Sequence, residues 1–297
     1  MNRIPAVLNI LMGAFLGVLL FSQLAFRKGE TRNTQFSPPP LPRQLSFAGE
    51  TVPMERWEVQ EKLDRELLLN YYSTGTIFYL MKLANRTFPV ISERLKANGV
   101  PDDFKYLCIA ESNMQAWARS SAGAVGYWQF LQGTGTGYGL ETSQQVDQRQ
   151  DLVRSTDAAC KYLKQAYSQF GNWTAAAASY NCGMGGYAGQ AAFQRTKNYY
   201  DLYLPEETNK YIFRILTFKY LFENAASLGF KVEEDEKYQP VETRQVAVNT
   251  SITDLAKFAI DNGTTYKMLR LLNPWIKGRS LNVTAGRQYV LQLPVRE

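Results

Sequence analysis

Residues Phe104–Ala118 read FKYLCIAESNMQAWA, and this stretch contains the most informative carboxylate of the chain. As a helix it places Leu107 and Cys108 on one apolar face, and Glu111 falls on that same face because it follows them by four and three residues. The sequence therefore directs a carboxylate inward. Such a glutamate more often pairs with an arginine or caps a loop; as a catalytic acid, burial would raise its pKa from about 4.3 to roughly 6.

The absence of histidine restricts the chemistry further. None of the 297 residues is a histidine, which excludes a Ser-His-Asp or Cys-His pair and a His-ligated zinc centre. Catalysis would have to come from carboxylates, Tyr, Lys or a bound group. Cys108, Cys160 and Cys182 fit neither a CxxC site nor a dense disulfide framework, and they allow at most one intramolecular disulfide. We expect no metal site and no cofactor.

Composition and charge point to a folded protein that does not bind nucleic acid. The chain is 45% hydrophobic and 20% charged, and its formal charge of +6 comes from scattered Lys and Arg without a basic run. Residues 183–188 formally fit G-x-G-x-x-A, but they follow an Ala-rich helical run where a dinucleotide site needs a strand. No phosphate-loop motif occurs. We therefore expect neither nucleic acid nor a nucleotide as a partner.

The N-terminal segment predicts export and membrane attachment. Residues 4–26 carry no charge and are long enough to cross a bilayer as a helix, so residues 1–28 are a signal peptide or a signal anchor. An uncleaved anchor is favoured, because no small-x-small cleavage site and no cysteine for lipidation are evident. Residues 29–51 are rich in proline and predict an extended linker. The alternative, a buried core helix, is disfavoured by this polar stretch.

The central and C-terminal parts predict different architectures. Residues 52–232 read as a mainly α domain without sustained strand alternation, with helical runs at 56–95, 102–118, 151–169, 173–181 and 206–228. Two glycine-dense segments, 123–139 and 171–189, predict irregular backbone close to a ligand. After a linker at 233–244, residues 245–297 predict a small α+β module with the order βααβ.

Four motifs of the central domain carry a family resemblance. They are Glu111-Ser112, Gly126-Tyr127-Trp128-Gln129-Phe130, Ala178-Ser179-Tyr180-Asn181-x-Gly183, and Leu204-Pro205-Glu206-Glu207-Thr208-x-x-Tyr211. In order and spacing they resemble the motifs of the family 1 lytic transglycosylases. The departures are Gln132 where a proline is usual, Tyr127 for Leu or Ile, and Ser179 for Ala, and none removes a reactive group. The C-terminal module is similar to a divergent LysM domain.

The resemblance implies a lysozyme-like α-helical catalytic domain of the goose type that cleaves peptidoglycan. Glu111 would act first as acid and then as base, cleaving the β-1,4 bond between N-acetylmuramic acid and N-acetylglucosamine and leaving 1,6-anhydro-muramoyl ends. By position, the implied substrate-binding residues are Ser112, Gln129, Tyr180, Asn181, Glu207 and Tyr211. Trp128 and Phe130 are either sugar platforms or core residues. Two alternatives stay open: a goose-type lysozyme that hydrolyses the same bond, and a non-catalytic wall-binding protein.

The same resemblance implies the partners and the compartment. We expect peptidoglycan glycan strands as the substrate, contact with a membrane through the N-terminal hydrophobic segment, and a periplasmic domain in a bacterial envelope. Arg27 and Lys28 outnumber Arg3 and would favour a cytoplasmic domain by flanking charge, but long domains translocate largely regardless of it. Endo or exo preference, peptide-stem preference and oligomeric state stay open.

Overall fold

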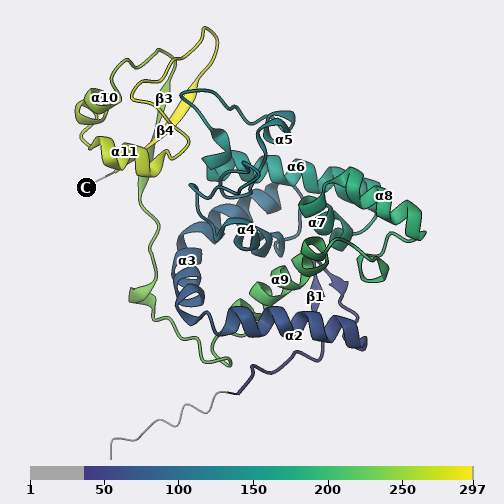
Figure 1. The fold of residues 1–297 in the computed structure, drawn as a ribbon. Coiled ribbons are helices and arrows are strands. Elements are labelled where there is room, and N and C mark those ends of the chain that lie inside the picture. The colour runs from purple at the N-terminus through teal and green to yellow at the C-terminus, as the bar shows by residue number, and fades with distance from the viewer. Residues whose placement is uncertain (1–36, 296–297) are drawn as a thin grey trace, which may run out of the picture. The chain divides into compact units, whose positions relative to one another are not determined.

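The computed structural model of the protein describes residues 37–295 (Figure 1). The expected N-terminal anchor at 1–28 and residues 29–36 of the expected linker lie outside these residues. The rest of that linker, 37–51, is described and contains a short hairpin at 46–51. Within the described part of the chain, no helix combines the length and the apolar character needed to cross a membrane.

A helical domain forms most of the described chain, which confirms the expected mainly α class. A small antiparallel hairpin of β1 (Ser46–Phe47) and β2 (Glu50–Thr51) precedes the helices. The helices are α2 (Trp57–Tyr71), α3 (Thr74–Ala97), α4 (Phe104–Ser112), α5 (Gln132–Gly137), α6 (Leu152–Phe170), α7 (Trp173–Cys182), α8 (Met184–Gln194) and α9 (Glu206–Glu223). Short 3₁₀ turns occur at η1 (Gln148–Gln150), η2 (Tyr199–Asp201) and η3 (Glu234–Glu236).

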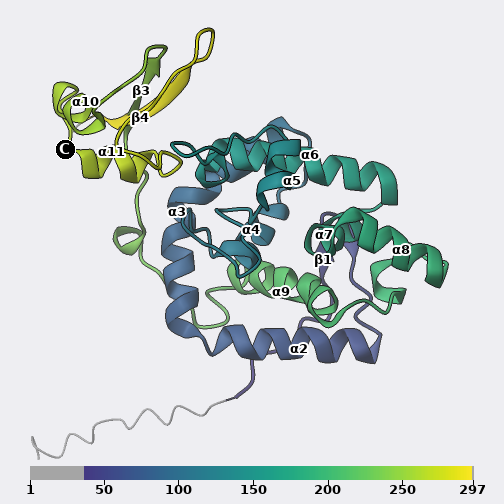
Figure 2. The same cartoon turned by 45° about the horizontal axis from the view of Figure 1, so that its top comes forward.

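Helix α7 lies at the centre of this domain and contacts α6, α8 and α9 (Figures 1 and 2). Its start is set by Asn172, whose side-chain oxygen accepts the Ala175 backbone N–H at 2.7 Å. The side chains of 175–178 are all alanine and fully buried. Because alanine is small, the surrounding helices approach α7 closely while its backbone remains regular.

Two local predictions are wrong; backbone conformation explains the first and burial against the core explains the second. The helix predicted over 102–118 ends at Ser112, because Asn113 and Met114 adopt left-handed φ values of 52° and 58°. The glycine-dense segment after 183 is helix α8 and not irregular backbone. Burial of Tyr187 against the core holds this helix despite its glycines.

The C-terminal module has the expected order βααβ. It contains β3 (Thr243–Val248), α10 (Leu255–Asp261), α11 (Tyr266–Leu272) and β4 (Tyr289–Pro294). The two strands pair antiparallel, with Thr243 opposite Pro294 and Val248 opposite Tyr289. The module has a hydrophobic core of its own, formed by Val248, Leu255, Ala259, Leu269, Trp275, Ile276, Leu281, Tyr289, Leu291 and Leu293, together with Val146 of the helical domain.

The loop that contributes Val146 attaches the module to the helical domain. Val146 forms a β-bridge with Ile276, and the Asp147 backbone N–H donates to the Trp275 carbonyl at 2.7 Å. The Lys277 N–H donates to the Gln145 carbonyl at 2.7 Å. Backbone bonds and a shared core therefore hold the module to this loop.

The same loop also supports the glycine-containing segment 123–130. Arg149 is buried and donates to both carboxylate oxygens of Asp147 at 2.9 and 2.8 Å, and its Nη1 donates to the Phe130 carbonyl at 3.1 Å. Gly126 has a φ of 84°, and a Cβ built on it would lie 1.9 Å from the Arg149 carbonyl oxygen. Only glycine fits this crossing of the two loops.

We therefore predict that Gly126→Ala lowers the free energy of unfolding by at least about 3 kcal/mol, since a left-handed backbone and a clash with main-chain atoms act together. Urea denaturation followed by circular dichroism measures the change. Gly133→Ala in α5 is the matched control, because a Cβ there would meet nothing within 4 Å. Equal stability of the Gly126 variant and the wild type would contradict this account of the loop crossing.

Candidate active site

Glu111 lies in the last turn of α4, where the helix meets α9. The Tyr211 hydroxyl, from the middle of α9, donates a hydrogen bond to the Glu111 Oε1 atom. Tyr211 is fully buried, and Glu111 is partly exposed. The arrangement gives the carboxyl group one fixed partner and leaves it reachable from one side.

Burial raises the pKa of the Glu111 carboxyl from 4.5 to about 7. The Tyr211 hydrogen bond and the positive charge of Arg214 oppose this shift, and the negative charge of Glu207 adds to it. Burial also raises the pKa of Tyr211 well above its usual value, and the Glu111 charge adds to that effect. Tyr211 therefore stays a hydrogen-bond donor, while Glu111 can both hold and release a proton near neutrality.

Ser112 and Tyr180 hold the loop that passes Glu111. The Ser112 hydroxyl donates to the Tyr127 carbonyl at 2.7 Å, and the Tyr180 hydroxyl donates to the Trp128 carbonyl at 2.8 Å. Burial raises the pKa of Tyr180 well above its usual value, with a contribution from the Glu111 charge. These two side chains, from α4 and α7, fix two consecutive carbonyl groups of one loop beside the carboxyl group.

The other residues of the motifs make structural contacts of their own. The Gln129 amide donates to the carbonyls of Gly126 at 2.8 Å and Ala118 at 3.1 Å, and Gln129 itself has a left-handed φ of 48°. The Asn181 side-chain oxygen accepts the Thr208 hydroxyl at 2.8 Å, which ties α7 to the first turn of α9. Glu207 is exposed in that same turn. The structure thus brings Tyr211 to Glu111, uses Ser112, Tyr180 and Gln129 to shape the loop, and leaves Glu207 at the surface.

The two aromatic residues with open roles are core residues. Trp128 is fully buried and its Nε1 donates to the Thr156 hydroxyl at 2.9 Å, and Phe130 is 3% exposed. The three cysteines are free thiols. Within residues 37–295, no three or more Cys, Asp or Glu side chains gather where they could hold a metal ion.

Two residues of the site, Arg214 and its partner Glu66, were not predicted from the sequence. Arg214 follows Tyr211 by three residues on α9 and lowers the pKa of Glu111 through its charge. Its Nε lies 3.5 Å from the Glu66 carboxylate, which is buried in α2 and also pairs with Arg65 at 3.1 Å. A signal for Arg214 was present in the sequence, because it lies on the same helical face as Glu207 and Tyr211. Glu66 lies 45 residues before Glu111, and no local pattern indicates that they share a site.

Two family matches cover much of the helical domain and the C-terminal module. Residues 88–202 match the family described as "Transglycosylase SLT domain", and residues 244–297 match "Soluble lytic transglycosylase C-terminal LysM-like domain". The chain therefore contains an SLT transglycosylase domain and a LysM-like C-terminal domain. The first match includes Glu111 and the helices α4 to α8.

Two curated proteins are similar to parts of this chain. Membrane-bound lytic murein transglycosylase D of Escherichia coli strain K12 is 29% identical over 206 residues, which are 68% of this chain and 45% of that protein. A putative tributyltin chloride resistance protein of an Alteromonas species is 31% identical over 97 residues, which are 32% of this chain and 46% of that protein. The chain spans about half the length of the curated relatives it matches.

Solved structures of two lytic transglycosylases are also similar. An inactive mutant of Slt from Pseudomonas aeruginosa aligns with a TM-score of 0.40 at 22% identity, covering 51% of this chain and 26% of that one. The 70 kDa soluble lytic transglycosylase of E. coli aligns with a TM-score of 0.42 at 15% identity, covering 62% of this chain and 34% of that one.

Because the pKa of Glu111 is raised, replacing this residue with a neutral one should change the free energy of unfolding by an amount that depends on pH. In the folded protein the pKa of Glu111 is about 7, above the usual glutamate value of 4.5. The folded state therefore binds the proton more tightly than the unfolded state, and the stability that this contributes at low pH is lost as the pH rises through about 7.

Glu111→Gln does not ionise, so it should equal or nearly equal the wild type in stability at about pH 4 and exceed it by on the order of 2 kcal/mol at about pH 8. Urea denaturation at a series of pH values measures the difference, with Glu61→Gln on the exposed face of α2 as the control. A stability difference that stays constant across this range would show that the Glu111 pKa is not raised.

Proposed function

We propose that this chain, which contains an SLT transglycosylase domain over residues 88–202, is a peptidoglycan lytic transglycosylase. Its substrate is the β-1,4 bond between N-acetylmuramic acid and N-acetylglucosamine, and its product is a 1,6-anhydro-muramoyl end. The observation that carries the proposal is one carboxyl group, Glu111, with a pKa of about 7 and a fixed tyrosine donor, in a motif of the matched domain.

The chemistry needs one group that first donates and then accepts a proton. Protonated Glu111 gives its proton to the glycosidic oxygen as the bond to the muramoyl C1 breaks. The resulting carboxylate takes the proton from the muramoyl C6 hydroxyl, whose oxygen attacks C1 and closes the anhydro ring. Glu111 ends protonated, as it began, so the cycle consumes no water and needs neither histidine nor metal ion.

Tyr211 and Arg214 make the same group effective in both steps. Each favours the charged carboxylate, since the Tyr211 hydrogen bond and the Arg214 charge lower the pKa that burial raises. These opposing effects leave the pKa of Glu111 at about 7, so both its protonated and its ionised form are well populated at neutral pH. A second carboxylate, which most glycosidases need, is replaced by the hydroxyl of the substrate.

The remaining motif residues shape and line the groove. Ser112 of α4 and Tyr180 of α7 hold the loop 125–130 from outside, and Gln129 braces it from within, so the loop would present one constant surface to the sugar. Asn181 and Glu207 lie near the start of α9, where they would contact the acetamido group and the rim of the groove. The enzyme acts on glycan strands in the periplasm and is held to a membrane by the hydrophobic segment at 4–26.

Glu111→Gln should lower the release of anhydro-muropeptides from purified murein by at least about a hundredfold, because glutamine neither donates nor recovers the proton. Murein binding should persist, since the substitution removes a charge from a site that favours the neutral form. Glu61→Gln, with the same chemical change on an exposed carboxylate of α2, should keep wild-type activity. Retention of more than about a tenth of the activity would exclude Glu111 as the acid.

Product mass separates the proposal from the lysozyme alternative. Anhydro ends are lighter than hydrolysed ends by one water, so mass spectrometry of digested murein reads the reaction directly. We expect only anhydro ends. Reducing ends would identify a hydrolase, and an unchanged murein would favour the wall-binding alternative.

Tyr211→Phe removes the donor that lowers the pKa of Glu111, so the pKa should rise. Activity falls as the pH rises through the pKa of the acid, and the alkaline limb of the rate profile should therefore move to higher pH in this variant. Turnover measured between about pH 5 and pH 9 tests this. An alkaline limb at the wild-type position would show that Tyr211 does not act on Glu111.

A further inference from the structure

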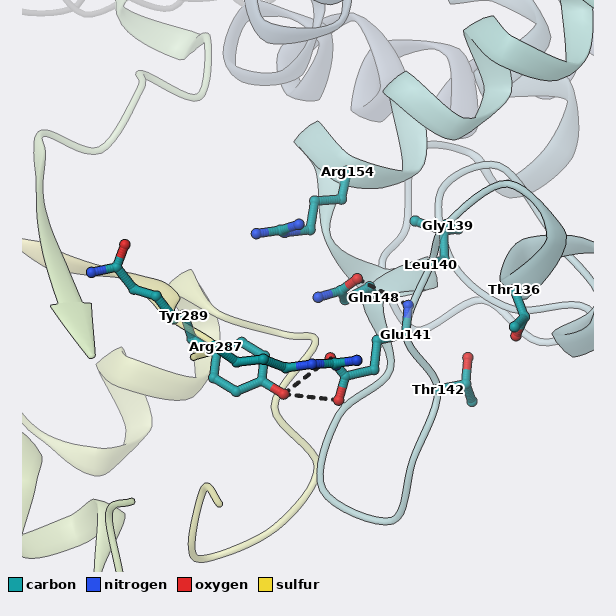
Figure 3. A pocket seen from close by; sticks show the side chains of 10 residues that line it. Thr136, Gly139, Leu140, Glu141, Thr142, Gln148, Arg154, Arg287 and Tyr289 are labelled. Atoms are coloured by element: carbon teal, nitrogen blue, oxygen red, sulfur yellow. Dashed lines mark hydrogen bonds and ion pairs between the residues drawn. The ribbon is translucent and has the colours of Figure 1, made fainter. Parts of the chain in front are cut away.

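A cavity of about 510 Å³ lies away from Glu111, between the segment 136–154 and the start of β4 (Figure 3). Its volume is within the range of pockets that bind small molecules. The helical domain contributes most of the lining and the C-terminal module the rest: Thr136, Gly139, Leu140, Glu141, Thr142, Gln148 and Arg154, then Arg287, Gln288 and Tyr289. No residue of the proposed catalytic mechanism lines it.

The two walls of this cavity are fixed to each other. The Tyr289 hydroxyl, in the first position of β4, donates to the Glu141 carboxylate at 2.8 Å, and Arg287 pairs with the same carboxylate at 3.2 Å (Figure 3). Below them, Val146 belongs to the core of the module. A pocket held by a shared core and an ion pair keeps its shape, which lowers the entropic cost of binding a ligand.

One wall presents hydrogen-bond donors toward the cavity. Gln148 is 5% exposed, and its side-chain oxygen accepts the Glu141 backbone N–H at 2.9 Å, which turns the amide nitrogen toward the open space. The Arg154 guanidinium extends into the same space and forms a long ion pair with the Asp151 carboxylate, 3.9 Å from its Nε, which is beyond hydrogen-bond distance. The Asp151 carboxylate accepts the Arg154 backbone N–H as the N-cap of α6.

The charge of the lining favours an anion. It contains the two guanidinium groups of Arg154 and Arg287 and the single carboxylate of Glu141. Arg287 and Tyr289 engage that carboxylate. Arg154 is paired only with Asp151, over 3.9 Å, so within the described residues its guanidinium N–H groups can still donate to a ligand. The Lys161 ammonium adds to the positive charge of Arg154, because a Cβ on the lining residue Gly139 would lie 3.8 Å from the Lys161 Nζ. Planar guanidinium and amide donors match the geometry of a carboxylate.

We propose that this cavity binds the carboxylate of an acidic peptide, seated between Arg154 and Gln148. The inference rests on the proposed function, since in peptidoglycan such a peptide is the stem attached to the muramoyl residue. The pocket would hold a stem while Glu111 acts on the glycan. The chain itself links this cavity to the loop near Glu111. Gln148 lines the cavity, and the next residue, Arg149, packs its backbone against Gly126 of that loop.

A binding experiment with a defined peptide tests the proposal. The probe is a fluorescein-labelled Ala-Glu-Lys tripeptide with free carboxylates, titrated with the full chain carrying Glu111→Gln so that no turnover occurs, and read by fluorescence anisotropy. Arg154→Gln should weaken binding at least about tenfold, because it removes the guanidinium that would bind the carboxylate. Lys164→Gln on the exposed face of the same helix loses the same charge outside the lining and should bind like its parent.

The same tripeptide with both carboxylates amidated should bind at least about tenfold more weakly than the free acid. Equal affinity for the two forms, or no effect of Arg154→Gln at unchanged melting temperature, would overturn the proposal. Arg154-dependent binding of a peptide-free chitotetraose would overturn it in favour of a sugar site. Release of anhydro ends from intact purified murein by the wild type is measured separately. Its absence would refute the proposed function and leave the peptide titration to decide the pocket.

Discussion

The hydrogen bond from Tyr211 to Glu111 is the contact on which the account of this protein depends. It joins α9 to the end of α4 at a place where burial alone would keep the carboxyl group protonated. A catalytic acid that must also act as a base needs an opposing influence, and the tyrosine donor with the Arg214 charge supplies it. Helix α2 takes part because Glu66 pairs with Arg214.

The rest of the helical domain positions this contact. The alanine run 175–178 lets α7 lie inside the domain, and Tyr180 in its last turn reaches the loop beside Glu111. The Asp147–Arg149 pair supports that loop from behind and lies in the segment that attaches the C-terminal module. The segment 145–149 therefore contacts both the C-terminal module and the loop near Glu111, although the hydrophobic core of the module is separate from that of the helical domain.

The sequence predicted the architecture well where the pattern was local. Helical periodicity indicated the mainly α domain, strand alternation indicated the βααβ module, and the apolar face of α4 indicated an inward Glu111. It failed where distant parts of the chain decide the outcome. Nothing local makes a helix of the glycine-rich α8 or places Val146 in the core of the module. The partnership of Glu66 with Arg214 likewise joins residues 148 apart.

The central claim is that Glu111 exchanges its proton near neutral pH, and direct titration tests it most simply. The ¹³C chemical shift of the Glu111 side-chain carboxyl, assigned by comparison with Glu111→Gln, is followed by NMR as the pH is raised. The account predicts a midpoint at about 7, well above the 4.5 of an unperturbed glutamate. A midpoint at the unperturbed value would contradict it, because one carboxyl group would then be too rarely protonated to serve as the acid.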